Sequence, residues 1–278
     1  MIRRIGRLFL QPLPARLLLL RLLDLQIGFL PYETKLSVES IARADYGFCL
    51  LHAARLAKQL GYASISAIEF GVAGGNGLVA LEMHAEHVAR CTGVNVAIYG
   101  FDTGAGMPPP ADFRDMPYLW QSGYYKMDVE RLRARLRKAK LVLGPVEETV
   151  RRFCEQEDPP PIGFIAIDLD YYSSTRKALN ILDAPFRYLL PRIACYVDDI
   201  VGDVYDAFNE YTGELLAIRE FNESKDHIKL ARVRGLRFFN GQIPRQWHEQ
   251  VFVAHLFTHP DYGRPLYGPT QQLPLVQG

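Results

Sequence analysis

The sequence predicts an α/β fold of the doubly wound type, in which helices cover both faces of a parallel sheet. Five short segments rich in β-branched and aromatic residues alternate with stretches long enough to be helices, which is typical of βαβ units. A glycine-rich turn follows the first segment, and aspartates follow three of the others. Polar turns of this kind fall at the carboxyl edge of such sheets, where ligands bind.

The first element of the pattern is a helix over residues 44–60, where apolar residues recur at helical spacing until Gly61. The expected strands then follow at residues 64–70, 96–101, 140–143, 163–167 and 193–197. Between them, the basic stretch 126–140 carries apolar residues at helical spacing, so it is expected to form a helix with a solvated charged face.

The later part of the chain is expected to add a helix over residues 204–221 and a strand over residues 247–257. From Pro260 onward, a composition rich in Pro, Gly and Gln indicates a loosely packed tail. The expected division is an N-terminal helical extension, a main domain and a C-terminal tail, over residues 1–60, 61–260 and 261–278.

Composition narrows the class of protein. The 278 residues include 32 Lys+Arg and 31 Asp+Glu, a formal net charge of +1, which argues against a dedicated nucleic-acid binder. A hydrophobic content of 49% allows a substantial core. The four cysteines are scattered, which favours neither a disulfide framework nor a cysteine zinc site, so a cytoplasmic setting is expected.

Residues 1–30 are basic and rich in leucine, with five arginines against Asp24 alone. Prolines and charged residues interrupt every apolar run, so neither a signal peptide nor a membrane span is expected. Two interpretations remain. The segment is either a basic amphipathic helix on an anionic membrane surface or a helix that packs on the domain or across a homo-oligomer, and the second is favoured.

The stretch A-I-E-F-G-V-A-G-G-N-G at residues 67–77 joins an expected strand to an expected helix. Its glycines let the backbone approach a nucleotide closely, and Glu69 is placed to organise the turn and meet a cationic ligand. Asp102 ends the second strand, where an acid accepts ribose hydroxyls in doubly wound folds. A tight structural corner and a simple turn cap are the alternatives for these two features.

Two carboxylate clusters, D-L-D after one strand and D-D after the next, are the most specific feature. Adjacent parallel strands would bring Asp168, Asp198 and Asp199 together, and three such carboxylates favour a hard cation such as Mg²⁺ between them. Asp170 is expected to point elsewhere and, with the serines after it, to start the next helix.

The chain resembles the class I S-adenosylmethionine-dependent methyltransferases, most closely the macrocin O-methyltransferase group of metal-dependent sugar O-methyltransferases. The resemblance rests on E-F-G-V-A-G-G, G-F-D-T-G-A-G-M-P, D-L-D-Y-Y-S-S-T and V-D-D, and it covers residues 65–201. It implies a Rossmann-like fold with a mostly parallel, seven-stranded sheet. It also implies a Mg²⁺-dependent enzyme that methylates a hydroxyl of a sugar on a glycolipid, polysaccharide or secondary metabolite.

The resemblance also implies roles for individual residues. Asp168 would serve as metal ligand and as proton acceptor. The methionine part of the cofactor would be bound by Glu69, Gly71 and Gly75, and its ribose by Asp102. A divalent metal would be bound by Asp168, Asp198 and Asp199. Tyr171 and Tyr172 stand where metal-dependent catechol methyltransferases place a lysine base, which disfavours a catechol substrate.

Alternatives remain at this stage. His227 or His248 is a second candidate for the base, and His84 with His87 and Glu86 is a minor candidate for a metal pair. A metal-dependent glycosyltransferase would use the D-x-D motif but leaves Glu69 and the glycine turn unexplained. A nicotinamide-dependent dehydrogenase lacks the expected glycine spacing, and an inactive S-adenosylmethionine-binding scaffold would not need all three aspartates.

Overall fold

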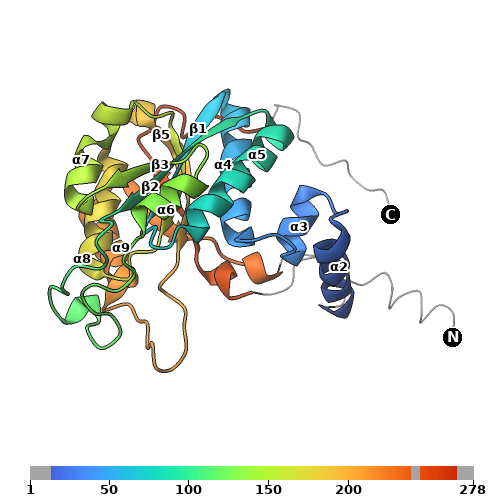
Figure 1. The fold of residues 1–278 in the computed structure, drawn as a ribbon. Coiled ribbons are helices and arrows are strands. Elements are labelled where there is room, and N and C mark those ends of the chain that lie inside the picture. Colours follow the sequence, from blue (N-terminus) through green and yellow to red (C-terminus); the bar gives the residue numbers. More distant parts are fainter. Residues whose placement is uncertain (1–13, 239–244, 268–278) are drawn as a thin grey trace, which may run out of the picture.

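The computed structural model describes residues 14–238 and 245–267, and its centre is a twisted sheet (Figure 1). Within this part of the chain the sheet has seven strands in the order β3-β2-β1-β4-β5-β7-β6. Only β7 runs against its neighbours, so the sheet is mostly parallel, as expected. The strands are β1 (Ser64–Phe70), β2 (Asn95–Asp102), β3 (Lys140–Leu143), β4 (Ile162–Ile167), β5 (Leu189–Val197), β6 (Ile228–Arg232) and β7 (Val251–Leu256).

Helices cover both faces of this sheet, with α4 and α5 on one side and α7, α8 and α9 on the other (Figure 1). Strands β1 and β4 are buried along almost their whole length, which suits their nearly continuous apolar sequences. The helices are α2 (Pro14–Ile27), α3 (Tyr32–Val38), α4 (Ala44–Leu60), α5 (Asn76–Thr92), α6 (Val129–Arg135), α7 (Val146–Glu157), α8 (Tyr172–Ala178) and α9 (Gly213–Ser224).

The strand order reverses its direction of growth between β1 and β4. From β1 the chain adds β2 and β3 on one side, and it then returns to add β4 and β5 on the other. Phe70 pairs with Phe101 of β2 and with Ile167 of β4, so these three strands end at the same level of the sheet. Ligand sites of open α/β sheets lie in the crevice beyond such a switch point.

Most of the predicted elements are confirmed, with three corrections. The helix predicted over residues 204–221 begins only at Gly213, because the short polar side chains of the preceding loop take up its backbone donors. Asp203, for example, accepts hydrogen bonds from the N–H groups of Tyr205 and Asp206. The predicted late strand begins only at Val251, after a 3₁₀ turn, and β6 was not predicted.

The segment that follows β7 is more firmly attached than its composition indicates. The hydroxyl of Tyr62 donates to Asp261 at 2.6 Å, and Arg264 donates to the carbonyl of Leu60 at 2.8 Å. The prediction of a loose tail is therefore wrong up to Arg264, and the rest of the predicted tail from residue 268 lies outside the described residues.

The predicted extension contributes directly to the main body. Helix α4 packs against α5, β4 and β5, whereas α2 and α3 lie to one side of the sheet (Figure 1). None of the helices among the described residues is both long enough and apolar enough to cross a bilayer. The division at residue 60 stays a prediction.

Candidate active site

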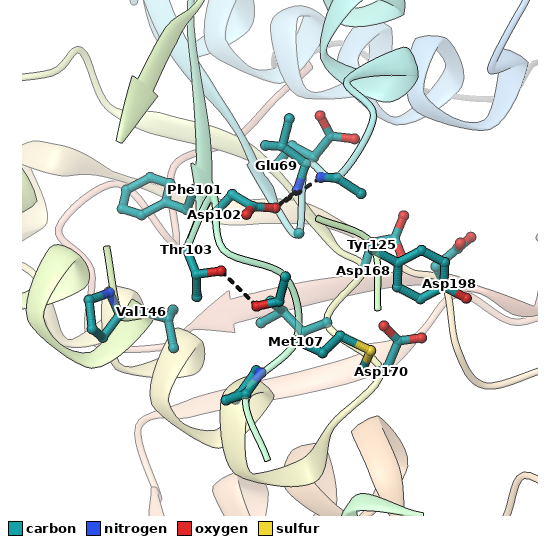
Figure 2. A pocket seen from close by; sticks show the side chains of 18 of the residues that line it. Glu69, Phe101, Asp102, Thr103, Met107, Tyr125, Val146, Asp168, Asp170 and Asp198 are labelled. Atoms are coloured by element: carbon teal, nitrogen blue, oxygen red, sulfur yellow. Dashed lines mark hydrogen bonds between the residues drawn. The ribbon is translucent and has the colours of Figure 1, made fainter. Parts of the chain in front are cut away.

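A cavity of about 700 Å³ opens at the crevice beyond the ends of β1 and β4. Every residue that the sequence singled out for the cofactor or the metal lines it, and these are Glu69, Gly71, Gly75, Asp102, Asp168, Asp198 and Asp199. Figure 2 shows Glu69 and Asp102 at one part of the cavity and Asp168, Asp170 and Asp198 at another. The cavity therefore joins the two predicted sites in one space.

The glycine turn approaches the neighbouring strand too closely for a side chain. Gly71 has a φ of +84°, and a Cβ atom there would lie 1.7 Å from the carbonyl oxygen of Asp168. Gly75 has a φ of +80° and immediately precedes α5, whose first two residues, Asn76 and Gly77, line the cavity. Both glycines are thus required by geometry, and the turn opens a helix N-terminus toward a ligand.

The carboxylate that organises this turn is Asp102. Its Oδ2 accepts hydrogen bonds from the N–H groups of Val72 at 3.0 Å and Ala73 at 2.9 Å, as Figure 2 shows. Its Oδ1 accepts a further bond from Gly104 at 2.6 Å. The expectation that Glu69 organises the turn is therefore wrong, because the end of β2 lies nearer to the turn's free N–H groups. Asp102 keeps acceptor capacity toward the cavity.

Glu69 is buried behind the turn, with 2% of its surface exposed. Its Oε1 accepts a hydrogen bond from the hydroxyl of Tyr46 at 3.1 Å, and its Oε2 has no partner among the described residues. Burial raises the pKa of Glu69 to about 8, although Arg43 and Tyr46 oppose that rise. An unpartnered buried carboxyl oxygen at the cavity wall is suited to a cationic ligand group.

Asp168, Asp198 and Asp199 bring one carboxylate oxygen each to within 4.8 Å of the others. Asp168 follows β4, and the other two follow β5, as predicted from adjacent parallel strands. Burial and the neighbouring carboxylates raise the pKa values of Asp168 and Asp199 well above their usual range. The donor set is all oxygen and mutually repulsive, so it fits a hard divalent cation such as Mg²⁺.

Asp170 joins this cluster instead of starting a helix. It has a φ of +59°, and its N–H donates to Oδ2 of Asp199 at 3.2 Å. Burial and Asp168 raise its pKa to about 7. The start of α8 is instead bound by Asp115, which accepts hydrogen bonds from the N–H and the hydroxyl of Ser173, both at 2.8 Å. The prediction for Asp170 is wrong because the left-handed turn redirects its side chain.

Sequence reasoning missed Arg43, which also lines the cavity. Its guanidinium lies 4.0 Å above the ring of Tyr46 and has its Nη2 atom 3.9 Å from Asp198. Two of its buried nitrogens, Nε and Nη2, have no hydrogen-bond partner among the described residues. Arg43 immediately precedes α4 and has a φ of +47°, which the sequence pattern did not signal. Nε also lies 3.5 Å from Oδ2 of Asp45, so the guanidinium faces two carboxylates, and its unbonded N–H groups can donate to the carboxylate of a ligand.

Tyr125 was also missed, and it lies beside the carboxylate cluster (Figure 2). Burial raises its pKa, and the charges of Asp170, Asp199 and Asp168 raise it further. It has a φ of +56°, a strained conformation for an aromatic residue. Together with Trp120 it places aromatic surface at the cavity wall. The sequence around Tyr125 shows only a loop rich in Gly and Tyr, which does not predict a position beside the carboxylates.

None of the four candidate histidines lines the cavity. His84 is buried, receives the hydroxyl of Tyr32 at Nδ1 and contacts two backbone carbonyls through Nε2. His87 stacks on the ring of Tyr32, which leaves no metal pair with His84. His227 is exposed, and His248 is buried against Trp247. The hypotheses of a histidine base and of a histidine metal pair are therefore not supported by the geometry.

Similarity to known proteins is found in the three-dimensional structure and not in the sequence. No family model matches the chain, and no curated protein matches its sequence. Among solved structures, CalS11, a calicheamicin methyltransferase, is 20% identical over 87% of this chain and 91% of its own, with a TM-score of 0.52. The chain has the class I methyltransferase fold.

Other methyltransferase structures superpose less closely. The O-methyltransferase NovP is 16% identical over 63% of this chain and 71% of its own, with a TM-score of 0.44. The O-methyltransferase TomG from Streptomyces achromogenes is 12% identical over 74% of this chain and 78% of its own, with a TM-score of 0.41. Within the methyltransferase fold, the cavity of this chain lies at the switch point between β1 and β4.

Proposed function

We propose that this chain is an S-adenosylmethionine-dependent, Mg²⁺-dependent O-methyltransferase that acts on a sugar hydroxyl of a glycolipid, polysaccharide or secondary metabolite. The observation that carries the proposal is the single cavity in which a glycine turn and helix N-terminus lie beside the cluster of Asp168, Asp198 and Asp199. A methyl donor and a metal-bound acceptor would meet in that space. The class I methyltransferase fold supports the choice of donor.

In this proposal, different residues around the turn bind different parts of the cofactor. Asp102 would accept the ribose hydroxyls, while Gly71 and Gly75 leave room for the backbone to approach. Glu69 would face the methionine ammonium, and Arg43 would donate to the methionine carboxylate. The opposite charges of these two side chains match the two charges of an amino acid, which is the physical reason for assigning them together.

The metal site would be held by Asp168, Asp198 and Asp199. When bound, a divalent cation would supply Lewis-acid activation of an acceptor hydroxyl, and S-adenosylmethionine would supply the methyl group. Asp168 would accept the hydroxyl proton as the oxygen–carbon bond forms and the carbon–sulfur bond breaks, which leaves S-adenosylhomocysteine. Without a cation, burial and the neighbouring carboxylates raise the pKa of Asp168, and a bound cation would oppose that rise, so the role of proton acceptor rests on the position of Asp168 beside the acceptor site.

The acceptor would lie between two loops that close over the cluster. The hydroxyl of Tyr118 donates to the backbone carbonyl of Asp206 at 3.0 Å, which joins the loop after β2 to the loop after β5. Trp120 and Tyr125 add flat aromatic faces at the cavity wall. A sugar presents hydroxyls on its edge and C–H groups on its face, so this combination of carboxylates and aromatic rings supports a sugar acceptor.

Calorimetric titration with S-adenosylmethionine, in Mg²⁺ and in EDTA, tests the cofactor. We expect micromolar binding that is lost in Asp102→Ala and retained in Asp226→Ala, an exposed aspartate away from the cavity. Arg43→Gln is expected to weaken binding about tenfold, and the exposed Arg55→Gln is its matched control. Binding of sugar nucleotides in place of S-adenosylmethionine would overturn the proposal and favour a glycosyltransferase.

Transfer of a labelled methyl group to a panel of sugars then tests the reaction. We expect turnover that requires Mg²⁺ and that falls strongly in Asp168→Asn. Binding of S-adenosylmethionine by that variant separates a lost catalytic step from a lost cofactor site. Cofactor binding without turnover on any hydroxyl acceptor would contradict the enzymatic part of the proposal and leave the scaffold alternative.

A further inference from the structure

Helix α2 turns its apolar side chains away from the protein. Leu19, Leu22 and Leu25 expose 57%, 60% and 59% of their surface, while Asp24 exposes only 2%. An ordinary surface helix does the reverse, because its apolar stripe faces the core. Helix α2 therefore contacts the domain, as one interpretation expected, but through Asp24 and not through its exposed leucines. The exposed set includes Leu18, Leu19, Leu22, Leu23, Leu25 and Ile27.

The outward orientation is fixed by the buried carboxylate of Asp24. Its Oδ1 accepts a hydrogen bond from the N–H of Leu30 at 2.7 Å, and its Oδ2 accepts one from Nζ of Lys35 at 3.0 Å. The hydroxyl of Ser40 donates to Oδ2 as well. Turning the leucines inward would take Asp24 out of this network, at a cost of several hydrogen bonds. The apolar face of α2 is thus held toward the outside.

The basic sequence of the N-terminal segment favours one covering surface. Residues 1–30 contain five arginines and one acidic residue, Asp24, which is paired with Lys35 inside the protein. Arg3, Arg4 and Arg7 precede the described residues, and Arg21 of α2 lies 3.8 Å from Glu39. Two copies of this basic segment would repel one another. An anionic bilayer would instead receive the leucines among its acyl chains and the arginines at its headgroups.

The molecule exposes a second apolar segment besides α2. Figure 1 shows α2 beside the sheet and the loop between β5 and α9 below it, both in the lower part of the view. Val204 and Tyr205 of that loop expose 90% and 86% of their surface.

We propose that α2 is an interfacial helix that binds the chain to the surface of an anionic bilayer. The helix lies in the headgroup region and does not span the membrane, in agreement with its 14 residues. Bound in this way, the protein would be held at a surface where a glycolipid acceptor is available. The membrane contact itself does not depend on the proposed methyl transfer.

Vesicle flotation of the full-length chain tests the proposal. We expect binding to vesicles of phosphatidylcholine with phosphatidylglycerol, little binding to phosphatidylcholine alone, and weaker binding at high salt. The triple variant Leu18→Gln/Leu22→Gln/Leu25→Gln keeps helix-forming side chains and is expected to lose at least tenfold in affinity. Circular dichroism and thermal melting verify that this variant folds.

A charge-matched pair of variants tests the electrostatic part. Loss of three arginines in Arg3→Gln/Arg4→Gln/Arg7→Gln is expected to weaken binding to anionic vesicles at least tenfold. The same loss of charge in Arg133→Gln/Arg151→Gln/Arg152→Gln, on exposed sites of α6 and α7, is expected to leave it nearly unchanged.

Three results would overturn the proposal. The first is absence of vesicle binding by the unaltered chain, and the second is undiminished binding by the leucine variant. The third is a dimer in light scattering that becomes a monomer in the leucine variant, without vesicle binding by either form. That outcome would assign the apolar face of α2 to a second copy of the chain.

Discussion

The carboxylate of Glu214 lies fully buried against the backbone of Asp199, whose N–H it receives at 3.1 Å. Its other oxygen receives the N–H of Leu169, also at 3.1 Å. Glu214 stands at the start of α9, so a single side chain ties the loop after β4 to the loop after β5. The spacing of the aspartate cluster therefore depends on a residue that does not belong to it.

Replacing Glu214 by Gln should weaken the metal site without removing a ligand. The amide presents one N–H₂ group to a backbone N–H, so one of the two hydrogen bonds is lost and the loops shift. Supporting residues of metal sites typically change affinity by about 10- to 100-fold. Calorimetry with Mn²⁺ or Mg²⁺ measures the change, and Glu223→Gln, exposed on the same helix, is the control. Equal metal affinities in the two variants would refute this role.

Asp199→Asn should stabilise the metal-free protein while it weakens metal binding. Burial, Asp170 and Asp198 together raise the pKa of Asp199, which shows that its charge is unfavourable there. The amide removes that charge and keeps an oxygen for the N–H of Asp170. We expect a rise of about 1 kcal/mol in unfolding free energy in EDTA, seen as about 2 to 4 °C in melting temperature.

Addition of Mg²⁺ should make the unaltered chain more stable than Asp199→Asn, which reverses their order of stability in EDTA. The unaltered chain gains stability from metal binding by mass action, by about 2.7 kcal/mol at a hundred times the dissociation constant, and Asp199→Asn gains less. Asp226→Asn, at an exposed site, should follow the unaltered chain in both conditions. A variant that is less stable than the unaltered chain in EDTA would contradict the argument from repulsion.

Gly71→Ala should be much more damaging than Gly61→Ala. Both glycines have nearly the same positive φ, +84° and +85°. A Cβ atom at Gly71 meets the carbonyl oxygen of Asp168 at 1.7 Å, whereas a Cβ atom at Gly61 meets nothing within 4 Å. The Gly61 variant should lose about 1 kcal/mol for its conformation alone.

The Gly71 variant should lose roughly 3 kcal/mol or more, because β1 and the loop after β4 must separate. Chemical denaturation of both variants measures the difference. Similar losses for the two would mean that the close approach at Asp168 is not important for the stability of the fold.

His84 should contribute stability that is lost in mild acid. Burial lowers its pKa to about 4 from a usual 6.5, although hydrogen bonds to the carbonyls of Ala42 and Arg43 oppose this. The folded protein therefore holds neutral His84, while the unfolded chain takes up a proton below pH 6.5. This contribution is fully present above that pH and is lost progressively down to about pH 4, by about 3 kcal/mol in total. Glu69 and Asp170, whose pKa values are raised, contribute in the opposite direction, so the effect of His84 is measured against a variant.

Unfolding free energies at pH 7.5 and pH 5 measure this dependence. His84→Gln keeps a donor toward the same carbonyls and cannot be protonated, so at pH 5 relative to pH 7.5 it should be more stable than the unaltered chain. His227→Gln, an exposed site, should retain the full dependence. An unchanged slope in His84→Gln would show that other groups control the acid sensitivity.

Local sequence patterns were sufficient for the elements that pack directly. Apolar periodicity gave α4 its observed bounds, because the residues that make its buried face also follow helical spacing. The loop before α9 was mispredicted because the aromatic residues at 208 and 211 share helical spacing, while the side chains of Asp203 and Asn209 compete for the backbone. Periodicity does not register that competition.

The sequence by itself determined the fold class and the seven candidate residues of the cavity, because glycines and acids that follow buried strands must collect at one edge of a parallel sheet. Only the tertiary structure decided that Asp102 holds the glycine turn, that Arg43 and Tyr125 line the cavity, and that Glu214 joins the two loops of the aspartate cluster. It also decided that the leucines of α2 face outward. These facts depend on contacts between distant segments and on left-handed backbone turns, neither of which leaves a periodic signal in the chain.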